Sequence, residues 1–311
     1  MAWGLRPRVA YHDTYWTASE EDRREYDAFG PWIYTVKAER DMPKRFRAAY
    51  DETRDSRFLL KIPRDVERRQ AAPGWDLYVA VLAVYDRGLS VIRMTPEGYS
   101  TQHLVWADVV ALKSYINLLI GRWTLLLRDG TAFTIDYNAV SSDLMDEVTS
   151  FVRSRWQRPA EAQAGSGPDV VTVSDHFFRY ELNAKRRSGP KPVVPIHFEP
   201  RDLACRDERN RRRKSTGVMF LDTPDELIII NRDTPTRRFW ETRYASYAIF
   251  VPYARLTAYR LIPPPPEHPG RFHELVLRLD RQLIRQACLV VPEQVLMQLM
   301  THGVPEDAEM V

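Results

Sequence analysis

Alternating apolar and polar positions predict an antiparallel hairpin over residues 123–135. Two registers are open to it. A two-residue turn would place Trp123 opposite Asp136, whereas a three-residue loop with Gly130 in the left-handed conformation places Trp123 opposite Ile135. The second register keeps one face of the hairpin apolar across both strands. We therefore predict the three-residue loop.

After the hairpin, the spacing of apolar positions changes to that of a helix. One face carries a continuous stripe of Leu144, Met145, Val148, Phe151 and Val152. Ser141 or Ser142 is expected to cap its first turn, where acidic residues also suit the helix dipole. Because such a stripe must pack on an apolar surface, a run of antiparallel strands closed by one amphipathic helix is the predicted unit.

Short apolar or alternating segments elsewhere predict further strands. They lie at residues 32–36, 57–62, 77–84, 89–94, 102–106 and 109–116.

The second half of the chain repeats the pattern of the first. The matching segments are 62–68 with 199–205, 89–92 with 227–230, 125–128 with 275–278, and 144–148 with 295–299. The offset between the halves is 137 or 138 in the first two pairs and 150 or 151 in the last two. One insertion, the proline-rich segment 263–270, explains this change. The alternative is a chance likeness between two β-rich halves.

Length and composition suggest two domains of a soluble protein. The chain has 311 residues, 44% of them hydrophobic, and a net charge of +3. We expect a cytoplasmic protein, because no secretory signal and no membrane-spanning segment are evident. The Ala, Gly and Pro content of residues 159–168 is typical of a linker. The predicted organisation is an N-terminal arm at 1–30, a first unit at 31–157, a linker at 158–170 and a second unit at 171–311.

A family resemblance follows from the order of these segments. Trp106 in the first half and Val251-Pro252 in the second each lead into a strand, which is followed by a hairpin and a terminal helix. Over residues 75–156 and 216–303 this order resembles the bacterial pleckstrin-homology-like (PH-like) fold. The resemblance implies a β-rich α+β protein with two tandem small β-sandwich or barrel units, each closed by a C-terminal helix. It also implies binding of lipids, peptides or proteins, although fold alone fixes no ligand.

The densest basic region is a candidate site for anions or anionic membrane. Its residues are Arg209, Arg211, Arg212, Arg213 and Lys214, with Lys185, Arg186 and Arg187 upstream. The alternative is a solvated loop, since acidic residues adjoin it. Nucleic acid is not an expected partner, because neither a recognition motif nor neighbouring stacking aromatics are evident.

Aromatic residues near the start of the second unit are candidates for partner binding. They are Trp240, Tyr244, Tyr247 and Tyr253, which would line a groove at a sheet edge. The alternative is that they fill the core of a small sandwich.

Catalytic and metal chemistry are not expected. His197 and Glu199 share one face of a predicted strand, but two ligands do not make a metal site. Neither Cys205 nor Cys288 lies in a metal-type or redox-type spacing. Nucleophile motifs and glycine-rich phosphate loops are missing as well. We therefore expect no catalytic residue, no metal and no cofactor.

The sequence thus favours a non-catalytic binding or scaffolding protein that recognises a protein or peptide partner. Two alternatives stay open: peripheral binding to anionic membrane or phosphate through residues 209–214, and an enzyme of unrecognised type. Homo-oligomers are open too, because sheet edges can pair between chains.

Overall fold

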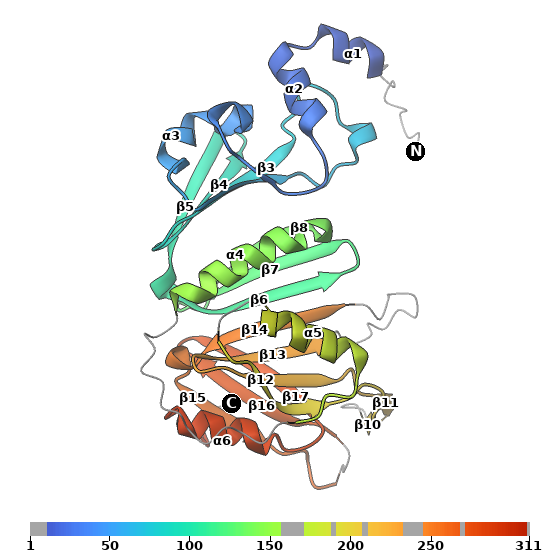
Figure 1. Cartoon of the computed structure of the whole chain (residues 1–311), viewed down its shortest axis with the longest axis vertical. Helices are drawn as coiled ribbons and strands as arrows, with labels where there is room; N and C mark the ends of the chain where they lie inside the picture. The colour runs from blue at the N-terminus through green and yellow to red at the C-terminus, as the bar shows by residue number, and fades with distance from the viewer. Residues whose placement is uncertain are drawn as a thin grey trace, which may run out of the picture. The chain divides into compact units, whose positions relative to one another are not determined.

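The structure is a computed structural model, which describes residues 11–156, 171–187, 191–206, 211–232, 245–267 and 271–309 (Figure 1). The chain divides into two compact units, residues 1–105 and residues 106–311. Antiparallel sheets with a few packed helices make up both units. The β-rich α+β class predicted from the sequence is therefore confirmed.

Unit 1 is one five-stranded sheet with helices packed on it. Its sheet order is β1-β2-β3-β4-β5. The elements are α1 (Tyr11–Thr17), α2 (Glu20–Ala28), β1 (Tyr34–Thr35), the 3₁₀ helices η1 (Glu39–Asp41) and η2 (Lys44–Ala49), α3 (Tyr50–Thr53), β2 (Phe58–Pro63), η3 (Arg68–Gln70), β3 (Tyr78–Val84), β4 (Gly88–Thr95) and β5 (Gly98–Val105).

The segment predicted to be an N-terminal arm contributes to the core of unit 1. Tyr26 and Phe29 are almost fully buried, in one cluster with Phe46 and Val81. Ser19 accepts a hydrogen bond from the Asp22 amide and so caps α2. The sequence pattern missed this packing because residues 11–29 show no clear apolar period.

Unit 2 begins with three strands and a helix, with one 3₁₀ turn before the strands and another before the helix. These elements are η4 (Trp106–Asp108), β6 (Val109–Asn117), β7 (Ile120–Leu127), β8 (Ala132–Asn138), η5 (Ala139–Ser141) and α4 (Ser142–Arg155). The elements that follow are α5 (His176–Arg187), β9 (Val194–Glu199), β10 (Ala204–Arg206), β11 (Arg212–Lys214), β12 (Val218–Asp222), β13 (Glu226–Arg232), β14 (Ser246–Pro252), η6 (Tyr253–Arg255), β15 (Ala258–Ile262), β16 (His273–Leu279), β17 (Gln282–Cys288) and α6 (Glu293–Thr301).

The same series of elements occurs twice along the chain. The first series is β2 to β5, η4, β6 to β8 and α4; the second is β9, β12 to β14, η6, β15 to β17 and α6. Three of the four matched pairs fall on corresponding elements: β4 with β13, β7 with β16, and α4 with α6. The fourth pair, 62–68 with 199–205, begins at the ends of β2 and β9. The proline-rich insertion lies between β15 and β16, as the offsets predicted. The second series also carries a two-stranded hairpin, β10–β11.

The described residues group differently from the predicted domains. Strand β6 pairs with β14, and Lys113 lies opposite Ile249 in that pairing. A seven-stranded sheet results, in the order β8-β7-β6-β14-β13-β12-β9. The end of the first series is therefore continuous with the second series, whereas β2 to β5 belong to unit 1. The predicted linker, residues 158–170, lies outside the described residues.

The hairpin register predicted from the sequence is confirmed. Trp123 lies opposite Ile135, and Gly130 has a φ of +94°. The indole Nε1 of Trp123 donates to Thr149 Oγ1 of α4 at 3.0 Å. This buried hydrogen bond, together with Met145 and Val148, holds α4 on the apolar face of the hairpin.

The predicted serine cap of α4 is wrong in detail. Ser141 occupies the N-cap position, but its side chain makes no capping hydrogen bond. Instead the side chain of Asn138 accepts from the Val140 amide at 3.0 Å and starts the short η5 turn that leads into the helix. A side chain three residues earlier does the capping because a 3₁₀ turn precedes the helix.

The larger core of unit 2 lies between its two main sheets. The inner face of the seven-stranded sheet packs on β15-β16-β17 and on α6, through residues such as Ile229, Val251, Leu277 and Leu299. Helices α4 and α5 cover the other face of the large sheet (Figure 1). One almost buried ion pair joins these layers, since Arg153 of α4 donates to both oxygens of Glu226 on β13.

Candidate functional site

Four exposed apolar side chains lie together at one end of unit 2. We name this set, Leu118, Leu119, Ile120 and Val140, the apolar tip. Their exposed fractions are 57%, 64%, 57% and 62%. Asn117 pairs with Ile120, so Leu118 and Leu119 form a two-residue turn between β6 and β7. The Ala139 amide donates to the Leu119 carbonyl at 2.8 Å, which brings Val140 to the turn.

The backbone of this turn is unusual for a leucine. Leu118 has a φ of +53°, a conformation that glycine or asparagine normally occupies and that costs a branched residue about 1–2 kcal/mol. Exposed apolar side chains at a strained turn do not stabilise the fold. Contiguous exposed apolar surface of this kind typically marks an interaction site.

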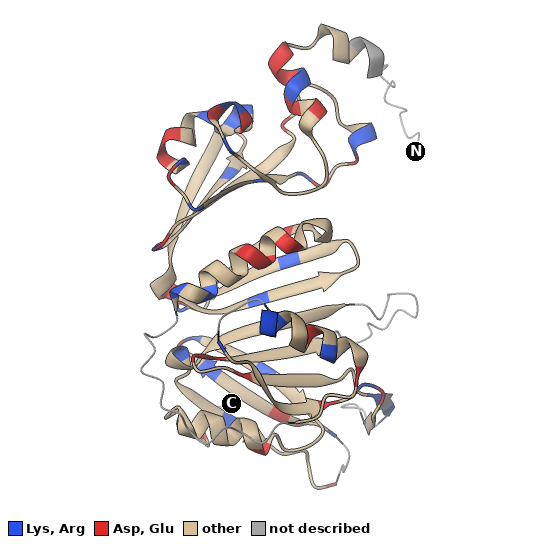
Figure 2. Cartoon of the chain, in the orientation of Figure 1, with Lys and Arg blue, Asp and Glu red and all other residues tan. Residues whose placement is uncertain are grey.

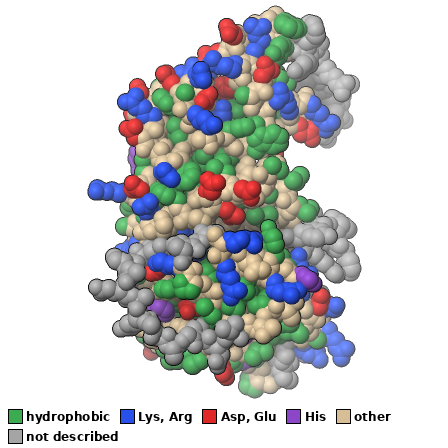
Figure 3. Space-filling view, in the orientation of Figure 1, with side chains coloured by type: hydrophobic (Ala, Val, Ile, Leu, Met, Phe, Trp, Pro, Cys, Tyr) green, Lys and Arg blue, Asp and Glu red, His purple; other side chains and the backbone are tan. Residues whose placement is uncertain are grey.

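Acidic residues flank the apolar tip. Directly after Val140 the chain enters α4, where Asp143, Asp146 and Glu147 are all exposed. Figure 2 shows acidic residues on the first half of α4 and basic residues at its end, and Figure 3 shows acidic side chains gathered over this helix. The arrangement repels anionic surfaces and attracts basic groups.

The predicted basic region is divided between two elements. Lys185, Arg186 and Arg187 end α5. Lys185 has only 14% of its side chain exposed and pairs with Glu181 at 3.7 Å, while Arg186 donates to the Val193 carbonyl.

Three of the remaining basic residues lie in a strand. Arg212, Arg213 and Lys214 are strand β11, which pairs with β10. Arg211, Arg212 and Lys214 are exposed, and Lys214 pairs with Asp202 at 3.4 Å. Arg209 lies outside the described residues. Within the described ranges, none of the helices is both long and apolar enough to cross a membrane.

The predicted aromatic groove is not what the described residues form. Tyr253 is only 6% exposed, and its hydroxyl donates to Asp222 at 2.6 Å, so its ring belongs to the core. Burial raises the pKa of the Tyr253 phenol well above its ordinary value, and the Asp222 charge adds to this effect. Tyr247 is partly buried against the same core. Trp240 and Tyr244 lie outside the described residues.

His197 and Glu199 do share one strand face, as the sequence predicted, and that face points into the core. The imidazole Nε2 of His197 lies 3.1 Å from Glu199 Oε1. The side chain of Glu199 is 3% exposed, and its two oxygens also accept the amides of Leu289 and Val290, both at 2.9 Å. A buried carboxylate thus fastens the end of β17 to β9.

A third residue with a metal-binding side chain joins this pair. The thiol of Cys288, fully buried at the end of β17, lies with the His197 and Glu199 ligand atoms in a group whose members are all within 4.8 Å of one another. Burial raises the pKa of the Cys288 thiol, and the negative charge of Glu199 raises it further. The thiol is therefore protonated at neutral pH.

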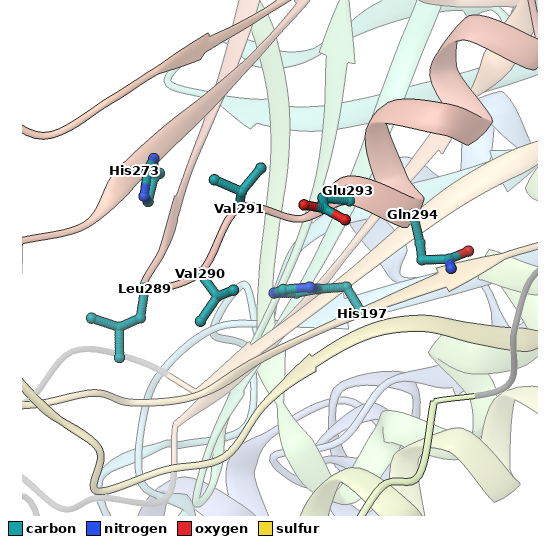
Figure 4. A pocket seen from close by; sticks show the side chains of 7 residues that line it. All are labelled: His197, His273, Leu289, Val290, Val291, Glu293 and Gln294. Carbon is teal, nitrogen blue, oxygen red and sulfur yellow. The ribbon is translucent and has the colours of Figure 1, made fainter.

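An open depression of about 600 Å³ adjoins the cluster. His197, His273, Glu293 and Gln294 line it, with the segment Leu289–Val291 between the two histidines (Figure 4). His273 lies directly across the strand pair from Cys288. Its Nδ1 is buried and has no hydrogen-bond partner among the described residues.

Sequence reasoning missed both Cys288 and the apolar tip. Cys288 is 89 residues from Glu199, so no local spacing connects the two. The apolar tip did carry a local signal, because Leu118-Leu119-Ile120 places three apolar residues at a turn where polar residues or glycine are usual.

The comparisons with known proteins give no further identification. The chain matches no protein-family model, and it matches no curated protein.

Proposed function

We propose that this chain is a non-catalytic binding or scaffolding protein, built from two PH-like units in tandem, that recognises a protein or peptide partner. The apolar tip carries the proposal. Four adjacent apolar side chains, each more than half exposed, form the kind of surface that marks a protein interaction site.

The repeated series of elements supports the tandem PH-like interpretation. Each copy has four strands in a meander, a short 3₁₀ turn, three more strands in a meander and a terminal helix. The copies meet edge to edge where β6 pairs with β14.

The acidic start of α4 indicates the chemistry of the partner. An interface with apolar anchors and a rim of Asp143, Asp146 and Glu147 suits a segment that has apolar residues flanked by lysine or arginine. The same charges oppose docking of the apolar tip on an anionic membrane.

A peptide-display selection on the full chain tests this function. Wild type is expected to enrich peptides with apolar anchors and basic flanks. Their affinity should fall more than about tenfold in the double variant Leu119→Asp, Ile120→Asp. Met300→Asp is the matched control, because Met300 is 57% exposed on α6 and lies outside the apolar tip. Equal binding by wild type and the double variant would refute the assignment of the surface.

A second function, binding to anionic membrane or phosphate, rests on the exposed Arg211, Arg212 and Lys214 of the β10–β11 hairpin. It predicts that the protein sediments with vesicles containing phosphatidylserine in a salt-dependent way. Arg211→Glu with Arg212→Glu should then abolish sedimentation, whereas the apolar-tip variant should leave it unchanged.

A further inference from the structure

The cluster of His197, Glu199 and Cys288 is polar at positions where the first series is apolar. The repeat offset of 137 relates His197 to Leu60 and Glu199 to Ile62, both buried. Cys288 pairs with His273 across β16 and β17, as Ile135 pairs with Trp123 across β7 and β8. The first series fills these positions with apolar side chains, so the architecture does not require polar ones.

We propose that His197, Glu199 and Cys288 form a zinc site. They supply one nitrogen, one oxygen and one sulfur ligand, the donor set that Zn²⁺ prefers. Bond lengths of roughly 2.0–2.3 Å in a tetrahedral site place ligand atoms about 3.3–3.7 Å apart. The three ligand atoms already lie within 4.8 Å of one another, so only small side-chain rotations are needed.

The metal would take the place of a proton. Glu199 binds the Leu289 and Val290 amides with one lone pair on each oxygen, and a metal leaves those bonds intact. Zn²⁺ would bind His197 Nε2 and Glu199 Oε1, with the imidazole neutral and its proton on Nδ1, and the thiol proton of Cys288 would pass to solvent. The charge of Zn²⁺ then balances one carboxylate and one thiolate.

The cluster holds its carboxylate without a lysine or arginine. Among the described residues, the partners of Glu199 are the two amides and His197. A buried carboxylate normally requires a compensating cation, and a metal ion provides one. His197 also lines the open depression, which gives water or a ligand group of a partner a route to the fourth position of the metal.

The test is Zn²⁺ and Co²⁺ titration of the untagged, full-length protein. We expect one equivalent to bind, and we expect the Co²⁺ form to show thiolate-to-cobalt charge-transfer absorption. Cys288→Ala should remove that absorption. His197→Gln should weaken Zn²⁺ binding by more than the roughly 10- to 100-fold that loss of an outer hydrogen-bond partner costs. Cys205→Ala is the matched control, because Cys205 is the other cysteine of the chain, is also buried and lies outside the cluster.

Thermal unfolding and cysteine alkylation test the zinc site even if one of the variants folds poorly. Zn²⁺ should raise the thermal midpoint of wild type and of Cys205→Ala, and should protect one cysteine from alkylation during mild denaturation. Cobalt binding without charge-transfer absorption, or equal Zn²⁺ affinity in wild type and Cys288→Ala, would overturn the zinc site. Neither result bears on the apolar tip, so the proposed partner binding is judged separately.

Discussion

The two series of elements use the same framework and fill it differently. At corresponding strand positions the first series has Leu60 and Ile62, whereas the second has His197 and Glu199. In the second series the polar pair survives burial because the amides of the β17 end satisfy the carboxylate. The strand framework therefore sets which positions are buried, while the local hydrogen-bond partners decide whether a polar residue is tolerated there.

Exchanging the residues between the series should have the largest effect. Leu60→His with Ile62→Glu buries an ionisable pair without the amide donors of the second series. We expect a loss of about 3–5 kcal/mol in the free energy of unfolding, measured in urea at neutral pH.

The reciprocal exchange is the matched control. His197→Leu with Glu199→Ile leaves two amides without an acceptor, which costs about 1–3 kcal/mol for each. Part of that cost is regained from apolar burial, so this variant should stay folded. If the first exchange were the milder of the two, the local-partner explanation would fail.

The helices that close the two series also differ: α4 makes a buried ion pair with the sheet, whereas α6 packs through apolar side chains. Glu226→Gln tests what the ion pair of α4 contributes. Arg153 of α4 pairs with Glu226, whose side chain is 4% exposed, and stacks over the ring of Phe250 at 4.3 Å. The substitution leaves Arg153 buried without its counter-charge, so we expect a loss of about 3–5 kcal/mol by urea unfolding.

An exposed ion pair provides the control for this prediction. Asp136→Asn removes the ion pair with Arg122, where both side chains are more than half exposed, and should cost less than about 1 kcal/mol. Comparable losses in the two variants would mean that burial does not set the strength of the Arg153–Glu226 pair. Helix α6 instead packs through apolar residues such as Val295 and Leu299.

Local patterns predicted many of the strands and helix α4, but they did not predict α1 and α2 or the pairing of strands distant in sequence. The register of the 123–135 hairpin followed from Gly130 and from keeping one face apolar, both of which are local properties. The pairing of β6 with β14 could not be predicted in this way, because an edge strand carries no mark of its partner. The same limit applies to the candidate zinc site: two ligands are neighbours in sequence, but Cys288 reaches them only through the packing of β17 on β9.

The loop between β7 and β8 and the corresponding loop between β16 and β17 place different residues at a positive φ. Gly130→Ala tests this difference, with a smaller expected effect. Gly130 has a φ of +94°, whereas the shorter loop of the second series has Asp280 at +53°. Alanine at position 130 should cost about 1–2 kcal/mol in unfolding free energy, because its Cβ disfavours this conformation. Asp280→Asn is the control and should cost less than about 1 kcal/mol, since asparagine tolerates the left-handed region. A neutral Gly130→Ala would show that the loop rearranges freely.

The helices that precede the two series differ in their caps, and Asp175→Asn gives the smallest expected effect. Asp175 accepts the Phe177 amide at 2.8 Å and pairs with Arg201 at 2.9 Å, whereas Pro43 before η2 offers no side-chain cap. Burial raises the pKa of Asp175, but the bonds from Arg201 and the helix amides outweigh burial, so the pKa is lowered. Asparagine keeps the cap and loses only the ion pair, which is partly exposed on the Arg201 side. We expect a loss of about 1 kcal/mol or less at pH 7.

The pH dependence identifies the source of that loss. A carboxyl whose folded pKa is lowered contributes stability above its unfolded pKa of about 3.9 and loses it as pH falls through the folded value. The difference in unfolding free energy between wild type and Asp175→Asn should therefore be constant from pH 7 to about pH 5 and shrink toward zero below about pH 4. Urea unfolding of both proteins across this range measures the difference, in which the other carboxyls cancel. A difference that persists unchanged at low pH would show that asparagine disturbs the geometry of the cap, and that the charge of Asp175 contributes little to starting α5.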